Sequence, residues 1–194
     1  MALIGRRGLV AGGLVAGGAT LAAALLIGKR QPEIVHLTEP TAEPLRGMAA
    51  MVRMPPQPAP AIAFVDATGI ARTLDSYRGK GVVLNVWATW CGPCVAEMPS
   101  LVALSRSADG FVVLPLSIDR GGAAVVGPWL RRHDAAALPV LIDDKQAAMT
   151  ALGVRGVPTT FVIDRAGRLR GSLEGGADWS TPDARATVLG LIGA

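Results

Sequence analysis

Hydrophobic and polar positions alternate in blocks along the second half of the chain. We expect strands over the apolar runs 82–87, 111–118 and 139–142, and helices over 91–104 and 122–133. The first two strands are nearly continuous apolar runs, which is typical of strands buried on both faces of a sheet. The helix over 122–133 contains Pro128 and is expected to bend there. Strands that alternate with helices predict an α/β domain with a partly parallel sheet.

The C-terminal third carries clear signals for turns and helix ends. A helix over 144–152 is expected to end at Gly153, because glycine accepts the left-handed conformation that closes many helices. Two β-rich runs, 159–164 and 169–173, flank a short polar turn and predict a hairpin. Thr181 followed by Pro182 marks the start of a last helix. The apolar residues expected on one face of that helix are Ala184, Val188 and Leu191.

The first 30 residues combine an uncharged apolar stretch with basic ends. Residues 8–28 carry no charge and lie between two pairs of basic residues. About 20 apolar residues are enough to cross the core of a bilayer, so we expect residues 1–30 to be a single membrane anchor. The first basic pair favours an N-terminus inside the cytoplasm and a domain outside it. The alternative is a signal peptide cleaved near the small residues 22–24.

Residues 31–57 are rich in proline and show no apolar periodicity. We interpret them as an extended tether that joins the anchor to a domain over residues 58–194. Met48, Met51 and Met54 follow one another at intervals of three within this segment. Thioether sulfur suits Cu(I), so a copper-binding function is one alternative. The other is a short hydrophobic patch that packs on the domain or on lipid.

Charge and cysteine content narrow the function classes. The formal net charge is +4, but residues 1–30 hold four of the 19 basic residues and no acid, so residues 31–194 balance 15 basic against 15 acidic side chains. No basic stripe remains for nucleic acid, and we expect no such partner. The chain has only two cysteines, which is fewer than a disulfide-stapled secreted scaffold usually carries. The cysteines are therefore expected to serve chemistry.

Cys91 and Cys94 stand two residues apart, directly after a buried strand and at the start of a helix. A helix N-terminus stabilises a thiolate, which is the attacking species in disulfide exchange. Cys94 lies one helical turn further on and is placed to resolve a mixed disulfide formed by Cys91. A zinc site would need four ligands, and no second Cys/His pair exists. A structural disulfide across so short a loop would remove little chain entropy.

The decapeptide 85–94 (NVWATWCGPC), the following Glu97-Met98-Pro99 and the later Gly156-Val157-Pro158-Thr159-Thr160 carry a resemblance. Together they resemble the TlpA/ResA-like family of membrane-anchored, extracytoplasmic thioredoxins. The resemblance covers about residues 58–194. It implies a thioredoxin fold, a central mixed sheet flanked by helices, behind an N-terminal transmembrane anchor. It also implies that the redox-active group is the Cys91–Cys94 disulfide, with no other cofactor and no metal.

The same resemblance implies further site residues. Val157–Pro158 would be a cis peptide beside the cysteines that exposes backbone for substrate pairing; the alternative is a trans proline that opens a strand. Trp90, Gly92 and Pro93 would contribute to the substrate groove. Trp90 is also expected at the rim of the domain.

Two polar positions near the cysteines need a separate interpretation. Ordinary thioredoxins have a buried aspartate where this chain has Asn85, and an amide does not accept a proton at neutral pH. Glu97 resembles the family's active-site glutamate and lies three residues past Cys94, on the same helix face. We expect it to take the proton of Cys94 during resolution. The alternative is an exposed acid near a helix N-terminus.

These observations predict an extracytoplasmic thiol–disulfide oxidoreductase. The Gly92-Pro93 dipeptide between the cysteines resembles that of reducing thioredoxins, which implies a protein-disulfide reductase. The resemblance implies apocytochrome c or copper-site proteins of terminal oxidases as clients, and a membrane protein as electron donor. We expect a monomer anchored in the cytoplasmic membrane through residues 8–28, with its domain in the periplasm. The alternatives are a copper-binding metallochaperone and a thiol oxidase or isomerase of opposite redox poise.

Overall fold

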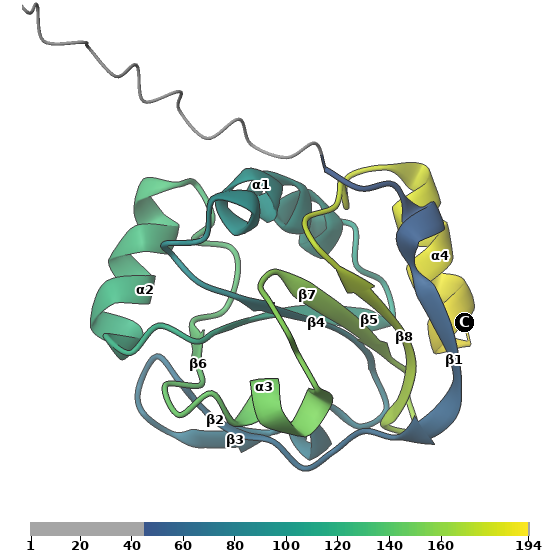
Figure 1. Cartoon of the computed structure of the whole chain (residues 1–194), viewed down its shortest axis with the longest axis horizontal. Coiled ribbons are helices and arrows are strands. Elements are labelled where there is room, and N and C mark those ends of the chain that lie inside the picture. The colour runs from purple at the N-terminus through teal and green to yellow at the C-terminus, as the bar shows by residue number, and fades with distance from the viewer. Residues whose placement is uncertain (1–44, 194) are drawn as a thin grey trace, which may run out of the picture. The chain divides into compact units, whose positions relative to one another are not determined.

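The computed structural model describes residues 45–193, which are built around one mixed sheet (Figure 1). The strands of the described region are β1 Val52–Pro58, β2 Ala63–Asp66, β3 Ala71–Thr73, β4 Gly81–Trp87, β5 Phe111–Ser117, β6 Leu141–Ile142, β7 Thr159–Ile163 and β8 Arg168–Glu174. The α-helices are α1 Gly92–Arg106, α2 Gly122–Arg132, α3 Ala147–Leu152 and α4 Pro182–Ile192. Short 3₁₀ helices cover Met48–Ala50 and Leu74–Tyr77.

The strands lie in the order β1-β8-β7-β4-β5-β6-β2-β3. Strand β4 is central: it pairs in parallel with β5 and antiparallel with β7, and all seven of its residues are buried. Strands β5 and β6 are parallel as well, whereas β7 and β8 form an antiparallel hairpin. The predicted α/β class and partly parallel sheet are confirmed, as are the predicted strands, with β6 shorter than expected.

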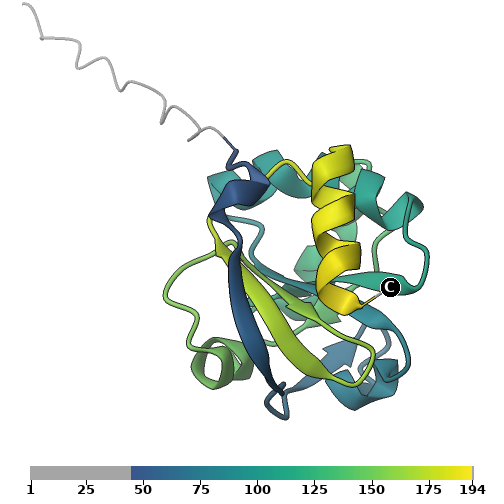
Figure 2. The same ribbon diagram turned by 90° about the vertical axis from the view of Figure 1, so that its right-hand side faces the viewer.

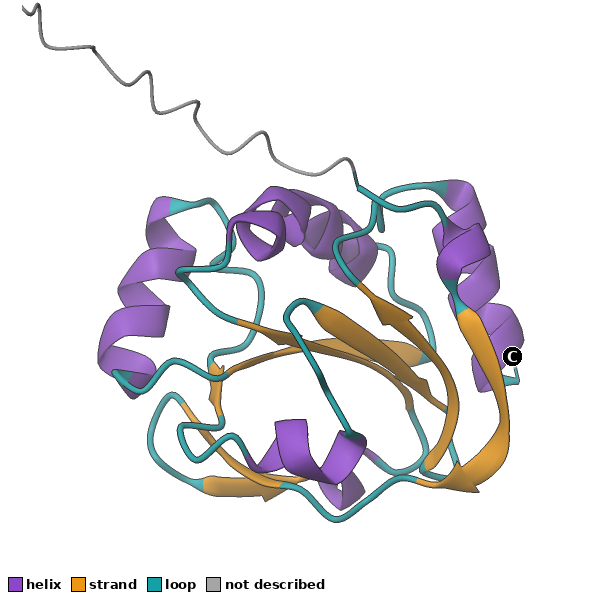
Figure 3. Cartoon of the chain, in the orientation of Figure 1, coloured by secondary structure: helices purple, strands orange, loops and turns teal. Residues whose placement is uncertain are grey.

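Helices lie on both sides of the sheet (Figure 3). In Figure 1, α1 lies over one side and α3 over the other, and Figure 2 shows α4 running beside the β1–β8 pair. Proline residues lie inside α1 and α2, as the sequence suggested. Helix α4 begins where the sequence predicts. Thr181 caps it, since its hydroxyl accepts a hydrogen bond from the Ala184 N–H, and Pro182 is the first helical residue.

The prediction that the domain begins at residue 58 is wrong. Strand β1 falls inside the expected tether, pairs with β8 and extends the sheet. Before it, Met48 and Met51 are buried in the hydrophobic core, which anchors this part of the chain to the domain. The interpretation of the methionines as a packed hydrophobic patch is therefore correct for these two. Residues of the expected tether before 45 lie outside the described part of the chain.

Helix α3 starts three residues later than predicted. The Asp143 carboxylate accepts hydrogen bonds from the N–H groups of Ala147 and Ala148, so it satisfies donors that the first helical turn leaves free. Gln146 immediately before the helix has a left-handed conformation, with φ of 56°. The helix then ends at Gly153 as expected.

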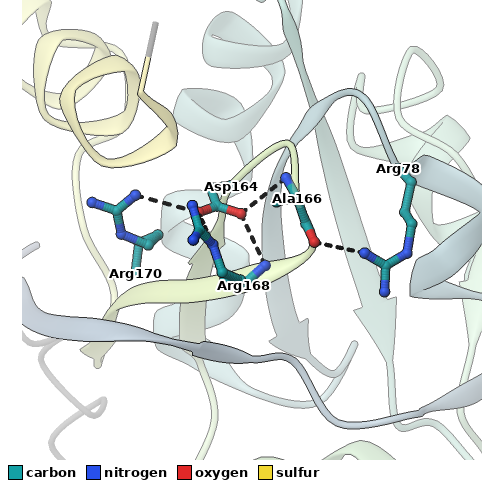
Figure 4. Close-up of polar contacts among 5 residues, drawn as sticks. All are labelled: Arg78, Asp164, Ala166, Arg168 and Arg170. Carbon is teal, nitrogen blue, oxygen red and sulfur yellow. Dashed lines mark hydrogen bonds and ion pairs between the residues drawn. The ribbon is translucent and has the colours of Figure 1, made fainter.

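The turn of the β7–β8 hairpin is held by Asp164 (Figure 4). Its buried carboxylate accepts hydrogen bonds from the N–H groups of Ala166 and Arg168, and it pairs with the side chains of Arg168 and Arg170. Arg78 donates to the Ala166 carbonyl oxygen and so ties the turn to the chain before β4. Although burial acts in the opposite direction, these hydrogen bonds hold the pKa of Asp164 below its usual value.

Within residues 45–193 no helix is both long and apolar enough to cross a membrane. The predicted anchor over residues 8–28 lies outside the described part of the chain.

Candidate redox-active site

The two cysteines lie at the N-terminus of α1, where the chain leaves the central strand. Cys91 is the N-cap residue, and its sulfur accepts a hydrogen bond from the Cys94 N–H at 3.2 Å. The two sulfurs are 2.14 Å apart and form a disulfide, with 5.2 Å between the Cα atoms. The free N–H groups and the positive end of the helix dipole face Cys91, which favours a thiolate there after reduction.

The two sulfur-bearing residues differ in exposure. Cys91 is 6% exposed, whereas Cys94 is completely buried. Around Cys91, the side chain of Trp90 is 68% exposed, Gly92 is exposed and Pro93 is half-buried. A large macromolecular disulfide can therefore approach the Cys91 side of the bond, and Cys94 is shielded from it.

The loop before β7 closes the other side of the cysteine pair. The Val157–Pro158 peptide is cis, as the resemblance implied. The Cys91 sulfur lies 3.5 Å from the Val157 carbonyl oxygen, so residues 66 positions apart in sequence meet at the disulfide. Val157 is half-buried and Pro158 is buried. The structure thus places Val157 and the cis Pro158 beside Cys91, whose neighbours along the chain are Trp90, Gly92 and Pro93.

Glu97 lies on the buried face of α1 and is completely inaccessible to solvent. Its Oε1 accepts a hydrogen bond from Asn85 Nδ2 at 2.8 Å. Its Oε2 accepts from the Ala177 N–H at 3.0 Å and from the indole Nε1–H of Trp179 at 3.1 Å. Burial raises the pKa of Glu97 to about 7, and the three hydrogen bonds oppose that rise. The alternative of an exposed acid is therefore wrong.

The donors from Ala177 and Trp179 were not foreseen from the sequence. They come from the loop between β8 and α4, about 80 residues after the glutamate. A backbone N–H carries no sequence signal, and Trp179 stands in a polar loop where nothing marks it as buried. Trp87, in contrast, ends the apolar run 82–87 that the sequence predicts to be a buried strand, and it is buried.

A second carboxylate, also missed from the sequence, holds the loop that leads to Cys91. Asp119 is 5% exposed and accepts hydrogen bonds from the Thr89 N–H and the Thr89 hydroxyl, and from the Ser117 hydroxyl. A usable signal existed: β4 and β5 are parallel neighbours, so polar residues just beyond their carboxyl ends meet at one edge of the sheet. These hydrogen bonds from Thr89 to Asp119 fix the backbone two residues before Cys91.

The copper alternative receives no support from this part of the chain. Met48 and Met51 are buried and pack in the hydrophobic core. Among residues 45–193 there is also no group of three or more His, Cys, Asp or Glu side chains placed to hold a metal ion.

Comparisons with known proteins agree with this site. Residues 55–188 match the Redoxin family. The chain is 34% identical over 117 residues to the thiol-disulfide oxidoreductase ResA of Geobacillus thermodenitrificans, covering 60% of this chain and 67% of that protein. Among solved structures, it resembles a Chlorobium tepidum protein assigned as the thiol:disulfide interchange protein DsbE, with TM-score 0.63, 27% identity and coverage of 73% and 99%.

A further similar structure is the exposed lipoprotein thioredoxin of Streptococcus pneumoniae, with TM-score 0.52 and 30% identity, covering 59% of this chain and 89% of that one. The predicted thioredoxin fold and the predicted family are thereby confirmed. The chain belongs to the Redoxin family, as a thioredoxin-fold thiol–disulfide oxidoreductase whose redox-active group is the Cys91–Cys94 disulfide.

Proposed function

We propose that this oxidoreductase works as a reductant of protein disulfides, with Cys91 as the attacking residue and Cys94 as the resolving one. The observation that carries the assignment is the unequal exposure of the two residues: Cys91 keeps 6% exposure beside the exposed Trp90, and Cys94 keeps none. Attack needs an accessible thiolate, whereas resolution takes place inside the protein.

The reaction balances as two exchanges. In the dithiol form, the Cys91 thiolate attacks one sulfur of the client disulfide, and the other client sulfur leaves as a thiolate that takes up a proton. Cys94 then loses its proton and attacks the Cys91 sulfur of the mixed disulfide. The client leaves as a dithiol, and the Cys91–Cys94 disulfide forms. Two electrons pass to the client, and an external thiol donor must return them.

Glu97 is proposed as the acceptor of the Cys94 proton. It follows Cys94 by three residues on one helix, so both side chains lie on the same buried face. A carboxyl with a pKa near 7 exists in both protonation states at neutral pH and can both accept and return a proton. A carboxylate with an ordinary pKa would be a weaker base for a thiol.

Substrate contacts are proposed for the residues that surround the accessible sulfur. The Val157 backbone, next to the cis Pro158, faces Cys91 and is placed to pair with an extended client segment. Trp90 offers an exposed apolar surface beside it, and Gly92 and Pro93 form the rest of the rim.

The cellular setting is also part of the proposal. The uncharged stretch 8–28 anchors the chain in the cytoplasmic membrane as a single span, and the domain faces the periplasm as a monomer. The electron donor is then a membrane protein, and the clients are exported proteins, with apocytochrome c and oxidase copper-site proteins as the first to test. The resemblance carried by the sequence motifs points to these clients, and the similarity to the ResA and DsbE proteins supports thiol–disulfide exchange as the reaction.

A matched pair of cysteine variants tests the roles. Cys94→Ser should accumulate a mixed disulfide with a disulfide-containing client peptide, because the resolving thiol is missing. Cys91→Ser should form none at neutral pH, because its remaining thiol is buried. Trapping through Cys94 in the second variant would reverse the assignment.

The reduction potential tests the direction of electron flow. Equilibration of the protein with dithiothreitol or glutathione, followed by tryptophan fluorescence, gives the potential of the cysteine pair. A value near or below about −200 mV agrees with a reductant of the thioredoxin kind. A value near about −120 mV would instead make the protein an oxidant, the main alternative.

A further inference from the structure

The Asn85 side chain is buried with one atom lacking a partner. Its Nδ2 donates to Glu97 Oε1 at 2.8 Å and to Thr160 Oγ1 at 2.9 Å, which uses both amide hydrogens. Its Oδ1 is inaccessible to solvent and makes no hydrogen bond. An unpaired buried acceptor is costly, and it calls for an explanation in a network that is otherwise satisfied.

The Glu97 carboxyl, in turn, faces hydrogen-bond donors alone among its described partners. These are Asn85 Nδ2 at Oε1, and the Ala177 N–H and Trp179 Nε1–H at Oε2. The set fits a carboxylate. A protonated carboxyl brings an O–H that must itself donate, and neither a backbone N–H nor an indole N–H can accept.

Asn85 can supply the missing acceptor. A half-turn of its amide exchanges Oδ1 and Nδ2, so Oδ1 would take the place between Glu97 and Thr160. The Thr160 hydroxyl accepts in the present arrangement and can donate in the other, because a hydroxyl does both. The half-turn moves Nδ2 away from Glu97, where its N–H would otherwise face the O–H of the protonated carboxyl. The half-turn gives up the two hydrogen bonds that Nδ2 donates and forms two at Oδ1, which makes none in the present arrangement.

We propose that the Asn85 amide is a two-position switch that turns with the protonation state of Glu97. It presents Nδ2 to the carboxylate and Oδ1 to the carboxylic acid, so each state of the buried group keeps a hydrogen-bonded partner. Asn85 is a positioning residue in this scheme, because it acts on Cys94 only through Glu97. Any effect of Asn85 on catalysis rests on the proposed transfer of a proton from Cys94 to Glu97. The rotation of the amide itself does not depend on that transfer.

No charged group complicates the titration among the contacts that the structure gives to Glu97. The partners from β4 and from the loop after β8 are an amide, a backbone N–H and an indole, and Thr160 of β7 lies one bond further. On its own helix, Cys91 and Cys94 do not titrate while they form the disulfide. Asp178 in the same loop directs its carboxylate to Ser180.

Nuclear magnetic resonance of the oxidised full chain tests the switch. We expect the Asn85 side-chain N–H₂ resonances to shift with the same midpoint as the Glu97 carboxyl carbon. Their Overhauser contact with the Thr160 side chain should be present at high pH and lost at low pH. An Asn85 signal that stays unchanged while Glu97 titrates would overturn the proposal.

Glu97→Gln provides an independent arm. Its neutral amide can donate from Nε2 towards Asn85 and accept from Ala177 and Trp179 at Oε1, so it imitates the protonated acid. The Asn85 signals should then be independent of pH and should match those of the wild type at low pH. A match to the high-pH wild type would refute the switch. The rate at which this variant resolves a mixed disulfide tests the proton transfer separately, so either idea can fail alone.

Discussion

Glu97→Gln should change how the stability of the protein depends on pH. The pKa of Glu97 is raised from its ordinary 4.5 to about 7, chiefly by burial. The native state therefore holds the Glu97 proton more tightly than the unfolded chain does. This contribution to stability is fully present below pH 4.5 and is lost as the pH rises through about 7.

The size of the effect follows from the two pKa values. Their difference is about 2.5, and each pKa unit corresponds to about 1.4 kcal/mol, so the wild type should lose about 3 kcal/mol through this group between pH 4 and pH 9. The glutamine variant carries no charge and avoids the loss. Its stability relative to the wild type should therefore rise by about 3 kcal/mol over that range.

Urea denaturation of the oxidised proteins at several pH values measures this difference, because the midpoint and slope together give the free energy of unfolding. The disulfide must stay intact, so that the cysteines add no titration of their own. Glu174→Gln is the matched control, because this glutamate is exposed and pairs with Arg155 at the surface. Parallel pH profiles for the wild type and the Glu97 variant would refute the reasoning.

Four further substitutions test other parts of the structure. Asp164→Asn should lower the free energy of unfolding at pH 7 by about 2 kcal/mol. The difference from the wild type should shrink as the pH falls through the lowered pKa of this aspartate. Urea denaturation at pH 7 and pH 3 measures both effects. Asp119→Ala removes the three hydrogen bonds that hold the loop before α1 and should cost about 3 kcal/mol in the same assay. Gly176→Ala places a Cβ 3.2 Å from the Pro93 carbonyl oxygen and should cost about 1 kcal/mol, whereas Gly190→Ala, in open space on α4, should stabilise by up to about 1 kcal/mol. Equal effects of the two glycine substitutions on thermal unfolding would contradict the packing at Pro93.

The sequence predicted the parts of the fold that rest on strong local patterns. Strand β4 is a continuous apolar run, and it is buried along its whole length. Strand β1 was missed because Pro55 and Pro56 interrupt any strand pattern and remove N–H donors. Such a segment can pair only as an edge strand, and its register with β8 shifts between Arg53 and Gln57.

The site residues also differ in whether local sequence features or long-range contacts determine them. Cys91 and Cys94 were predicted because their spacing and their place after a strand are local features. The surroundings of Glu97 were not, because its partners come from β4 and from a loop about 80 residues later. The raised pKa arises from that long-range enclosure, and the local spacing that placed Glu97 on the cysteine face carries no information about it.

The enclosure also explains why an amide suits position 85. A carboxyl there would lie within hydrogen-bond distance of Glu97, and two such acids titrate as a coupled pair that shares one proton. The shared proton would bind tightly, so the second ionisation of the pair would move to high pH. Asn85 leaves one titrating carboxyl, still linked by a hydrogen bond to the central strand. The chain can therefore keep a single buried carboxyl with a pKa near neutrality three residues after Cys94 on the same helix.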